Sequence, residues 1–188
     1  MIYSWKKIVK LGLPLLTITI FIEIIAGQIL QSKQESLLVI IPIFLISIPV
    51  INSVAGNIGS VLGARLASGL HVGYITLNFR DKEMHDNLLI SLLMGFFTYF
   101  ILSIFIYSIA ILGNLAEDIA VEKYIAIFVL TGILLVFIVA LVSVLTAFYS
   151  FKRGLDPDDV VAPVVTTVGD VMGIVFLFIM LGIFGVGI

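Results

Sequence analysis

The chain has 188 residues, of which 61% are hydrophobic and 12% are charged, and its net charge is -2 at pH 7. Soluble domains carry about a quarter charged residues, so this composition indicates an integral membrane protein. The charge balance provides no basic face for nucleic acid, and the absence of cysteine excludes disulfides and thiolate metal sites. Oxygen atoms are therefore the metal ligands that this sequence supplies most readily.

Five apolar segments are long enough to cross a bilayer as helices, which requires roughly 20 mostly apolar residues each. The sequence therefore predicts an all-α integral membrane protein, with residues 1–188 forming a single transmembrane domain. The first segment is too long for the core of a signal peptide and is interpreted as a span. The second is too long for one straight span, so we expect it to tilt, to break near Gly56 or to extend past the bilayer. The five expected helices cover about residues 8–30, 37–70, 87–112, 121–150 and 160–187.

The distribution of Lys and Arg predicts the orientation of these helices in the membrane. Cytoplasmic loops carry an excess of basic residues, and a cytoplasmic N-terminus leaves only Lys33 and Lys123 outside. We therefore expect a multi-pass protein of the cell membrane with its N-terminus inside and its C-terminus outside. Tyr124 is among the aromatic residues expected at a membrane interface. The eight basic residues then placed on the cytoplasmic side are Lys6, Lys7, Lys10, Arg65, Arg80, Lys82, Lys152 and Arg153.

Three polar side chains, Glu23, Asn57 and Asp170, lie deep within the expected spans. Ionisable groups inside a membrane are costly and are by default candidates for a functional site. At a rise of about 1.5 Å per residue, Asp170 lies roughly 15 Å along its helix, and the other two lie at similar depth. We therefore expect these three groups, on three helices, to cluster near the middle of the bilayer.

Each of these residues also has a purely structural explanation. A protonated Asp170 or a neutral Glu23 could form a hydrogen bond within its own helix, and Asn57 could join two helices, as buried Asn often does. The local partners would be Thr166 for Asp170, and Thr19 or Gln28 for Glu23.

Small residues line one face of the second expected span, with a pair recurring every four residues. This span and the last one each contain a Gly-x-x-x-Gly spacing, at Gly59 and Gly63 and at Gly169 and Gly173. Small residues allow helix backbones to approach closely. The glycines beside Asn57 could instead expose backbone carbonyls to a cavity, since irregular backbone at this depth must be buried or line water. The small residues are Ala55, Gly56, Gly59, Ser60, Gly63, Ala64, Ala67 and Ser68.

The last polar loop contains three carboxylates just before the fifth expected span. Asp156 suits the N-cap of that helix, Pro157 suits its first position, and Asp158 and Asp159 suit its first turn. Together the three carboxylates would also concentrate cations at the cytoplasmic mouth of a pathway.

Three stretches carry motifs that resemble those of a known family. Pro49 precedes "AGNIGS" at 55–60, which is similar to an element that combines Pro with Gly-Gly-Asn-x-Gly-Ser/Thr. The segment "RLASGLHVG" at 65–73 is similar to the segment that follows this element in the same family. The segments "GLDP" at 154–157 and "PVVTTVGD" at 163–170 are similar to an Asp-Pro and a Pro-x-x-Thr-Thr-x-x-Asp signature. These elements, in this order, resemble the MgtE magnesium channels and the related solute-carrier magnesium transporters, and the resemblance covers essentially the whole chain.

The resemblance implies a homodimer in the lipid bilayer, with a cation pathway lined by the second and fifth helices. It implies that Asp170 is the pore aspartate. Ala55 departs from the pattern by replacing the usual first glycine, and Val61 stands where many bacterial members have glutamine. The other positions onto which the family's pathway residues fall are Gly56, Asn57, Gly59, Thr166 and Thr167.

The chemistry of Mg²⁺ agrees with this assignment on separate grounds. Mg²⁺ takes oxygen ligands and gives up its waters reluctantly, so a sparse site with one carboxylate per subunit suits it. Two Asp170 side chains at a dimer axis would supply the charge, and the ion would offset the cost of burying them. We therefore expect a Mg²⁺ transporter and not an enzyme, with a ligand set that Mn²⁺ or Co²⁺ would also accept.

Three alternative functions stay open at this point. A Na⁺- or H⁺-coupled divalent cation exchanger is favoured by Glu23, because a passive channel needs no such coupling group. A non-transporting partner subunit of a larger complex is the second alternative. An intramembrane aspartyl protease would use a Gly-Asp pair but needs two neighbouring aspartates, which only a dimer could supply through Asp170.

Overall fold

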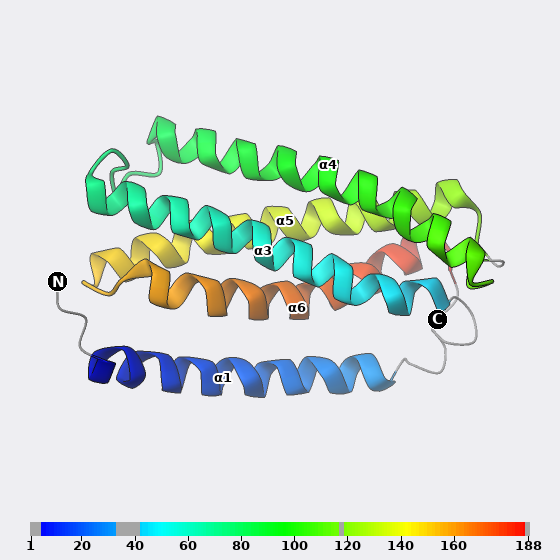
Figure 1. The fold of residues 1–188 in the computed structure, drawn as a ribbon, viewed down its shortest axis with the longest axis horizontal. Coiled ribbons are helices and arrows are strands. Elements are labelled where there is room, and N and C mark those ends of the chain that lie inside the picture. The colour runs from blue at the N-terminus through cyan, green and yellow to red at the C-terminus, as the bar shows by residue number, and fades with distance from the viewer. Residues whose placement is uncertain (1–4, 33–41, 117–118, 187–188) are drawn as a thin grey trace.

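The computed structural model describes residues 5–32, 42–116 and 119–186, which form five long helices side by side in a bundle (Figure 1). All five helices are long and apolar enough to cross a membrane. The predicted all-α fold with five transmembrane helices is confirmed. The helices are α1 (Trp5–Ser32), α3 (Pro42–Val72), α4 (Lys82–Leu112), α5 (Val121–Lys152) and α6 (Pro157–Ile183).

The second predicted segment is one continuous helix in the described residues. α3 runs from Pro42 to Val72 with Pro49 inside it, so the break considered at Gly56 does not form. The predicted residues 37–41 lie outside the described part of the chain, as does residue 187 at the end of the last segment.

Aspartates cap the starts of α4 and α6, and α4 begins earlier than the predicted residue 87. Asp81 caps α4, which starts at Lys82, by accepting a hydrogen bond from the backbone N of Met84 at 3.3 Å. The Asp81 carboxylate also accepts bonds from the hydroxyl and the backbone N of Thr76, and these bonds hold its pKa below the ordinary value. Asp156 caps α6 by accepting a bond from the backbone N of Asp158 at 3.2 Å, which confirms its predicted role as N-cap.

The helices differ in how much of their surface they bury. α3, α5 and α6 pack against one another, α4 covers α3 and α5, and α1 packs against α6 alone among the described helices (Figure 1). Only 6% of the apolar stretch of α1 is buried inside the protein, against 50% for α3 and for α5. α1 is thus a peripheral helix that touches the bundle along one side.

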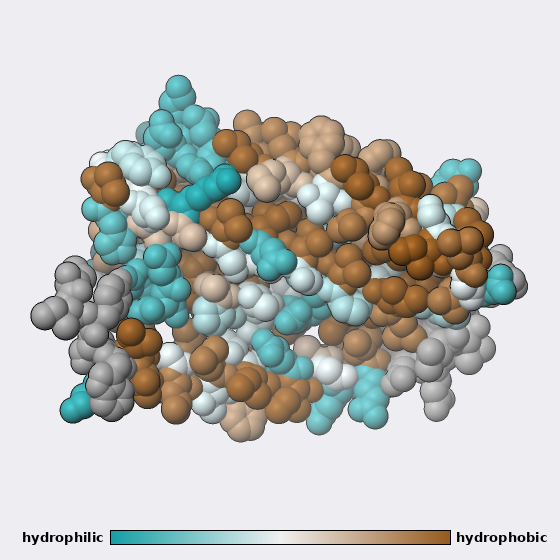
Figure 2. All heavy atoms as spheres, viewed as in Figure 1, coloured by the Kyte–Doolittle hydropathy of each residue, from teal (hydrophilic) through white to brown (hydrophobic). Residues whose placement is uncertain are grey.

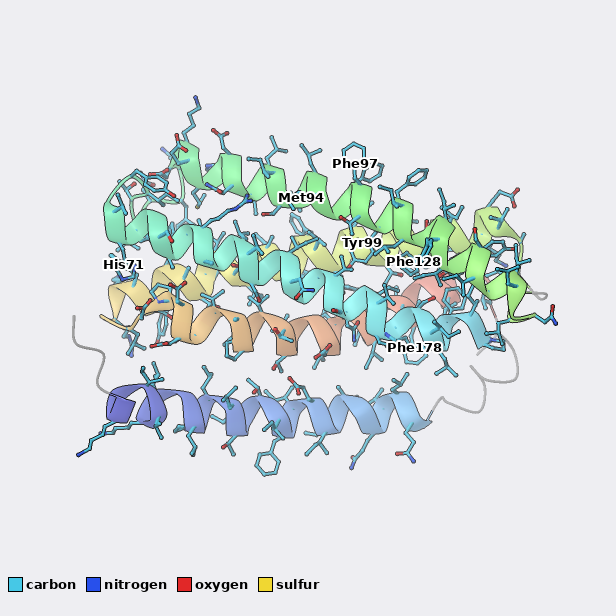
Figure 3. All side chains as sticks on the ribbon, viewed as in Figure 1. His71, Met94, Phe97, Tyr99, Phe128 and Phe178 are labelled. Carbon is cyan, nitrogen blue, oxygen red and sulfur yellow. The ribbon has the colours of Figure 1, made fainter. Side chains whose placement is uncertain are left out.

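Aromatic side chains fill the space between α3, α4 and α5. The rings of Tyr99 and Phe128 meet edge to face with centroids 5.9 Å apart (Figure 3), and the Tyr99 hydroxyl donates to the carbonyl of Ile51 at 2.6 Å. Tyr124 is fully buried, and its hydroxyl shares a hydrogen bond of 2.8 Å with Ser47. Tyr124 lies in the first turn of α5, so its expected position at a membrane interface stays a prediction, while its ring packs inside the bundle.

Glycines set the close packing of α3 against α5 and α6. A Cβ at Gly59 would overlap the side chains of Val139 and Val165, and a Cβ at Gly63 would overlap Val161. Both glycines are buried. This part of the small-residue stripe therefore serves helix packing, as small residues commonly do between membrane helices.

Gly63→Ala is expected to destabilise the protein, because Val161 is β-branched and has little rotamer freedom to move away. The loss should be roughly 1–3 kcal/mol, seen as a lower unfolding midpoint of the purified protein in detergent. Gly27→Ala on α1 is the matched control, since a Cβ there has nothing within 4 Å. Equal unfolding midpoints for the two variants would contradict a close contact between Gly63 and Val161.

Candidate cation site

Asp170 lies on α6 next to Gly169, which packs closely against the backbone of α3. A Cβ at the preceding Gly169 would lie 3.7 Å from the backbone N of Gly56 and 3.8 Å from the carbonyl O of Asn52. The two helix backbones therefore almost touch beside Asp170. Its side chain is half-buried, so it faces neither a closed core nor an open surface.

Glu23 reaches the same level from α1. Its carboxylate accepts a hydrogen bond of 2.8 Å from the hydroxyl of Thr167, which is 4% exposed. Thr167 lies one turn before Asp170 on α6, so this bond brings Glu23 to the Asp170 turn. The structure thus brings the two deep carboxylates of the sequence into one site, on facing helices.

The local hydrogen bonds that were considered for these acids do not form. Thr166 donates instead to the carbonyl of Ala162 at 2.8 Å, and Thr19 donates to the carbonyl of Leu16 at 3.0 Å. The partner of Glu23 lies on another helix, so bonding within one helix does not explain why either acid is present.

Asn57 lies on the exposed side of α3. No hydrogen bond joins its side chain to Asp170 in the part of the chain that is described. The neighbouring Gly56 is buried against α6, where a Cβ would lie 3.6 Å from the hydroxyl of Thr166, and Thr166 is itself exposed. The hydrogen bonds connect Glu23 to the Asp170 turn, and the place of Asn57 in the expected cluster stays a prediction.

The exposed side of α3 is lined by small and polar residues. Figure 2 shows hydrophilic patches in the middle of the face on which α3 and α6 lie, between hydrophobic areas. Lipid tails favour apolar side chains, so this surface suits contact with water or with protein. The exposed small and polar residues, called here the polar stripe, lie at helical spacing with the exposed apolar Val61 among them; they are Ser53, Asn57, Ala64 and Ser68.

The backbone oxygen of Gly59 already has a protein partner. The Ser143 hydroxyl donates to it at 2.9 Å, from α5. A role for Gly59 as a source of an ion-facing carbonyl stays a prediction, and its packing between Val139 and Val165 is what the structure describes.

The three acids at the start of α6 lie together at one end of the bundle. Asp158 is exposed, and Asp156 and Asp159 are partly exposed. His71 at the end of α3 lies near enough to interact electrostatically with Asp158. The acids therefore border the end of α3 as well as α6, and their service as a cation-collecting mouth stays a prediction.

Asn52 is a site residue that the sequence pattern alone did not single out. Its side-chain amide donates to the backbone carbonyl of Asp170 at 3.2 Å, and the residue is 8% exposed. Its oxygen Oδ1 is buried without a hydrogen-bond partner. One signal was available, because Asn52 precedes Gly56 by four residues and so shares its helix face.

The oxygen atoms of one protomer make an incomplete site for a divalent ion. In the described part of the chain, no three His, Cys, Asp or Glu side chains come together as a metal-binding group. The site offers two carboxylates, Glu23 and Asp170, with hydroxyl and amide groups around them. A hard divalent cation here would complete its shell with water or with oxygens from a second copy.

The comparison with protein families agrees with this oxygen-rich site inside a membrane bundle. A family model described as a divalent cation transporter, MgtE, matches residues 48–180, a range that begins in α3 and ends in α6. No curated protein matches the chain significantly. The match covers more than half of the chain and describes transporters rather than enzymes. The chain therefore belongs to the MgtE family of divalent cation transporters.

Proposed function

We propose that this protein carries Mg²⁺ across the cell membrane as a homodimer, through a pathway lined by α3 and α6. The observation that carries the proposal is the pair of acids on facing helices of a membrane bundle: Glu23 accepts a hydrogen bond from Thr167, one turn before Asp170 on α6. Two neighbouring anions in a low-dielectric interior repel each other strongly, and a divalent cation offsets that repulsion. Asp170 is the ion-binding carboxylate in this proposal.

The ligand chemistry supports a hard cation. Mg²⁺ binds one or two carboxylates, keeps several waters and tolerates amide and hydroxyl oxygens. The groups near Asp170 are of this kind: Thr166 and Thr167 supply hydroxyls one turn away, and Asn57 supplies an exposed amide at the border of α3. Mn²⁺ and Co²⁺ accept similar oxygen ligands and compete for such a site.

The exposed polar stripe of α3 supports the homodimer. A second copy packed on this stripe would shield Asn57 and its polar neighbours from lipid. It would also bring a second Asp170 toward the first, because Thr166, which is exposed beside α3, lies one turn before Asp170 on the same side of α6. Doubling the carboxylates supplies the charge that one protomer lacks.

The arrangement of basic residues supports a cytoplasmic N-terminus. The starts of α1, α4 and α6 and the ends of α3 and α5 lie at one end of the bundle (Figure 1). Lys82 and Lys152 lie at that end and Lys123 at the other. The positive-inside rule then places the common end in the cytoplasm, with Asp156, Asp158 and Asp159 at the entrance.

Asp170→Asn is expected to abolish Mg²⁺ flux into proteoliposomes, because the amide keeps the size of the side chain and removes its charge. The wild type should give flux above empty liposomes, and the variant should fall to their level. Asp86→Asn is the matched control, since Asp86 is an exposed acid at the start of α4. Wild-type flux in the Asp170 variant would remove this residue from the pathway.

A coupled exchanger is the second candidate, and the position of Glu23 favours it. Glu23 is a second acid at the Asp170 turn, on a helix that contacts only α6 among the described helices. In an exchanger, a Na⁺ or pH gradient drives Mg²⁺ movement, and this second carboxylate would bind the coupling ion.

Glu23→Gln keeps an oxygen that can accept the Thr167 bond but removes the charge. If the protein is an exchanger, gradients of Na⁺ or pH should accelerate wild-type Mg²⁺ flux, and the variant should lose this acceleration. The measurement is Mg²⁺ flux with and without each imposed gradient. Wild-type flux that is insensitive to both gradients would exclude exchange and leave a passive channel.

A further inference from the structure

We infer that Asn52 is a positioning residue for Asp170, and that its carboxamide fixes the Asp170 turn against α3 and thereby sets the affinity for the transported cation. The inference rests on the proposed role of Asp170 as the ion-binding carboxylate. Asn52 itself does not touch the ion in this arrangement, because its side chain is buried between α3 and α6.

The side-chain amide of Asn52 binds Asp170, the ion-binding residue of the proposed site. Its Nδ2 donates to the Asp170 carbonyl at 3.2 Å. A side chain on α3 therefore restrains the backbone of the Asp170 turn on α6.

Asn52 packs against the two glycines on either side of Asp170, Gly169 and Gly173. The backbone of Asn52 lies against Gly169, where a Cβ would be 3.8 Å from its carbonyl O. The side chain of Asn52 lies against Gly173, where a Cβ would overlap the amide oxygen Oδ1. The Gly-x-x-x-Gly spacing of α6 thus forms a socket for one residue of α3, and Asp170 stands between its two halves.

The unpaired oxygen of Asn52 argues against a role in packing alone. Oδ1 is buried without a hydrogen-bond partner, and leaving a buried acceptor unpaired is unfavourable. A leucine, which has a similar branched shape, would fill the socket without that cost. The favourable contribution of Asn52 must therefore come from its Nδ2 donor, which acts on Asp170.

Asn52→Leu is the first test, because it keeps the branched shape of the side chain and removes the donor. The half-saturating Mg²⁺ concentration should rise by about tenfold, both for thermal stabilisation of the purified protein and for flux into proteoliposomes. The unfolding midpoint without divalent ion should stay near that of the wild type. A half-saturating concentration equal to the wild type would overturn the inference.

Tyr99→Phe is the matched control. It removes a buried hydrogen bond to the carbonyl of Ile51, the residue next to Asn52, but from α4 on another side of α3. It should lower the unfolding midpoint without changing the half-saturating Mg²⁺ concentration. If it weakens Mg²⁺ binding as much as Asn52→Leu does, general loosening of α3 explains both variants and the positioning role is wrong.

A second pair of variants separates packing from hydrogen bonding if Asn52→Leu does not fold. Gly173→Ala should displace the Asn52 amide and weaken Mg²⁺ binding. Adding Asn52→Ala makes room for the new methyl group, so the double variant should regain stability but not affinity. Recovery of affinity in the double variant would overturn the inference.

The same measurements distinguish this inference from the proposed function. A wild type that shows neither Mg²⁺-dependent stabilisation nor Mg²⁺ flux would overturn both. A wild type that responds to Mg²⁺, loses the response in Asp170→Asn and keeps it in Asn52→Leu would overturn the positioning role of Asn52 alone.

Discussion

The near contact of the α3 and α6 backbones at Gly56 and Gly169 is the constraint on which the candidate site depends. Lipid tails are as apolar as the helix surfaces, so association of membrane helices relies on close packing and on interhelical polar bonds. Glycine permits both here, because it removes the side chains that would hold the backbones apart. At this separation Asn52 can reach the Asp170 turn, and Asp170 is placed at the border of two helices instead of in lipid.

α1 is held to the bundle more weakly than the other helices are held to one another. This helix buries little of its apolar surface, and α6 is the only described helix that it contacts. Its one described hydrogen bond to another helix is the one between Glu23 and Thr167. Model studies assign such interhelical bonds about 0.6 to 2 kcal/mol, which is modest for a whole helix. A helix held in this way can bring a carboxylate to the site without being locked into the core, which is consistent with the role proposed for Glu23 in ion coupling.

Much of the fold was predictable, because a bilayer leaves the backbone few choices. An apolar segment of sufficient length must form a helix to satisfy its own hydrogen bonds, and Asp156 with Pro157 marked the start of α6 correctly. The start of α4 was placed too late because the cap at Asp81 depends on a turn that includes Thr76. The bond between the hydroxyls of Tyr124 and Ser47 was not predictable, because the two residues lie far apart in the sequence and no local signal connects them.

The sequence by itself determined the class of the protein, the presence of its spans, the depth of Glu23 and Asp170, and the motifs that match the MgtE family. These properties depend on composition and on distance along one helix. Only the tertiary structure decided which polar groups meet: Glu23 pairs with Thr167, Asn52 holds the Asp170 turn, and Asn57 faces outward. Such contacts depend on how each helix is rotated about its axis. A helix that is apolar on every side carries little sequence signal for that rotation, because lipid and protein neighbours favour the same side chains.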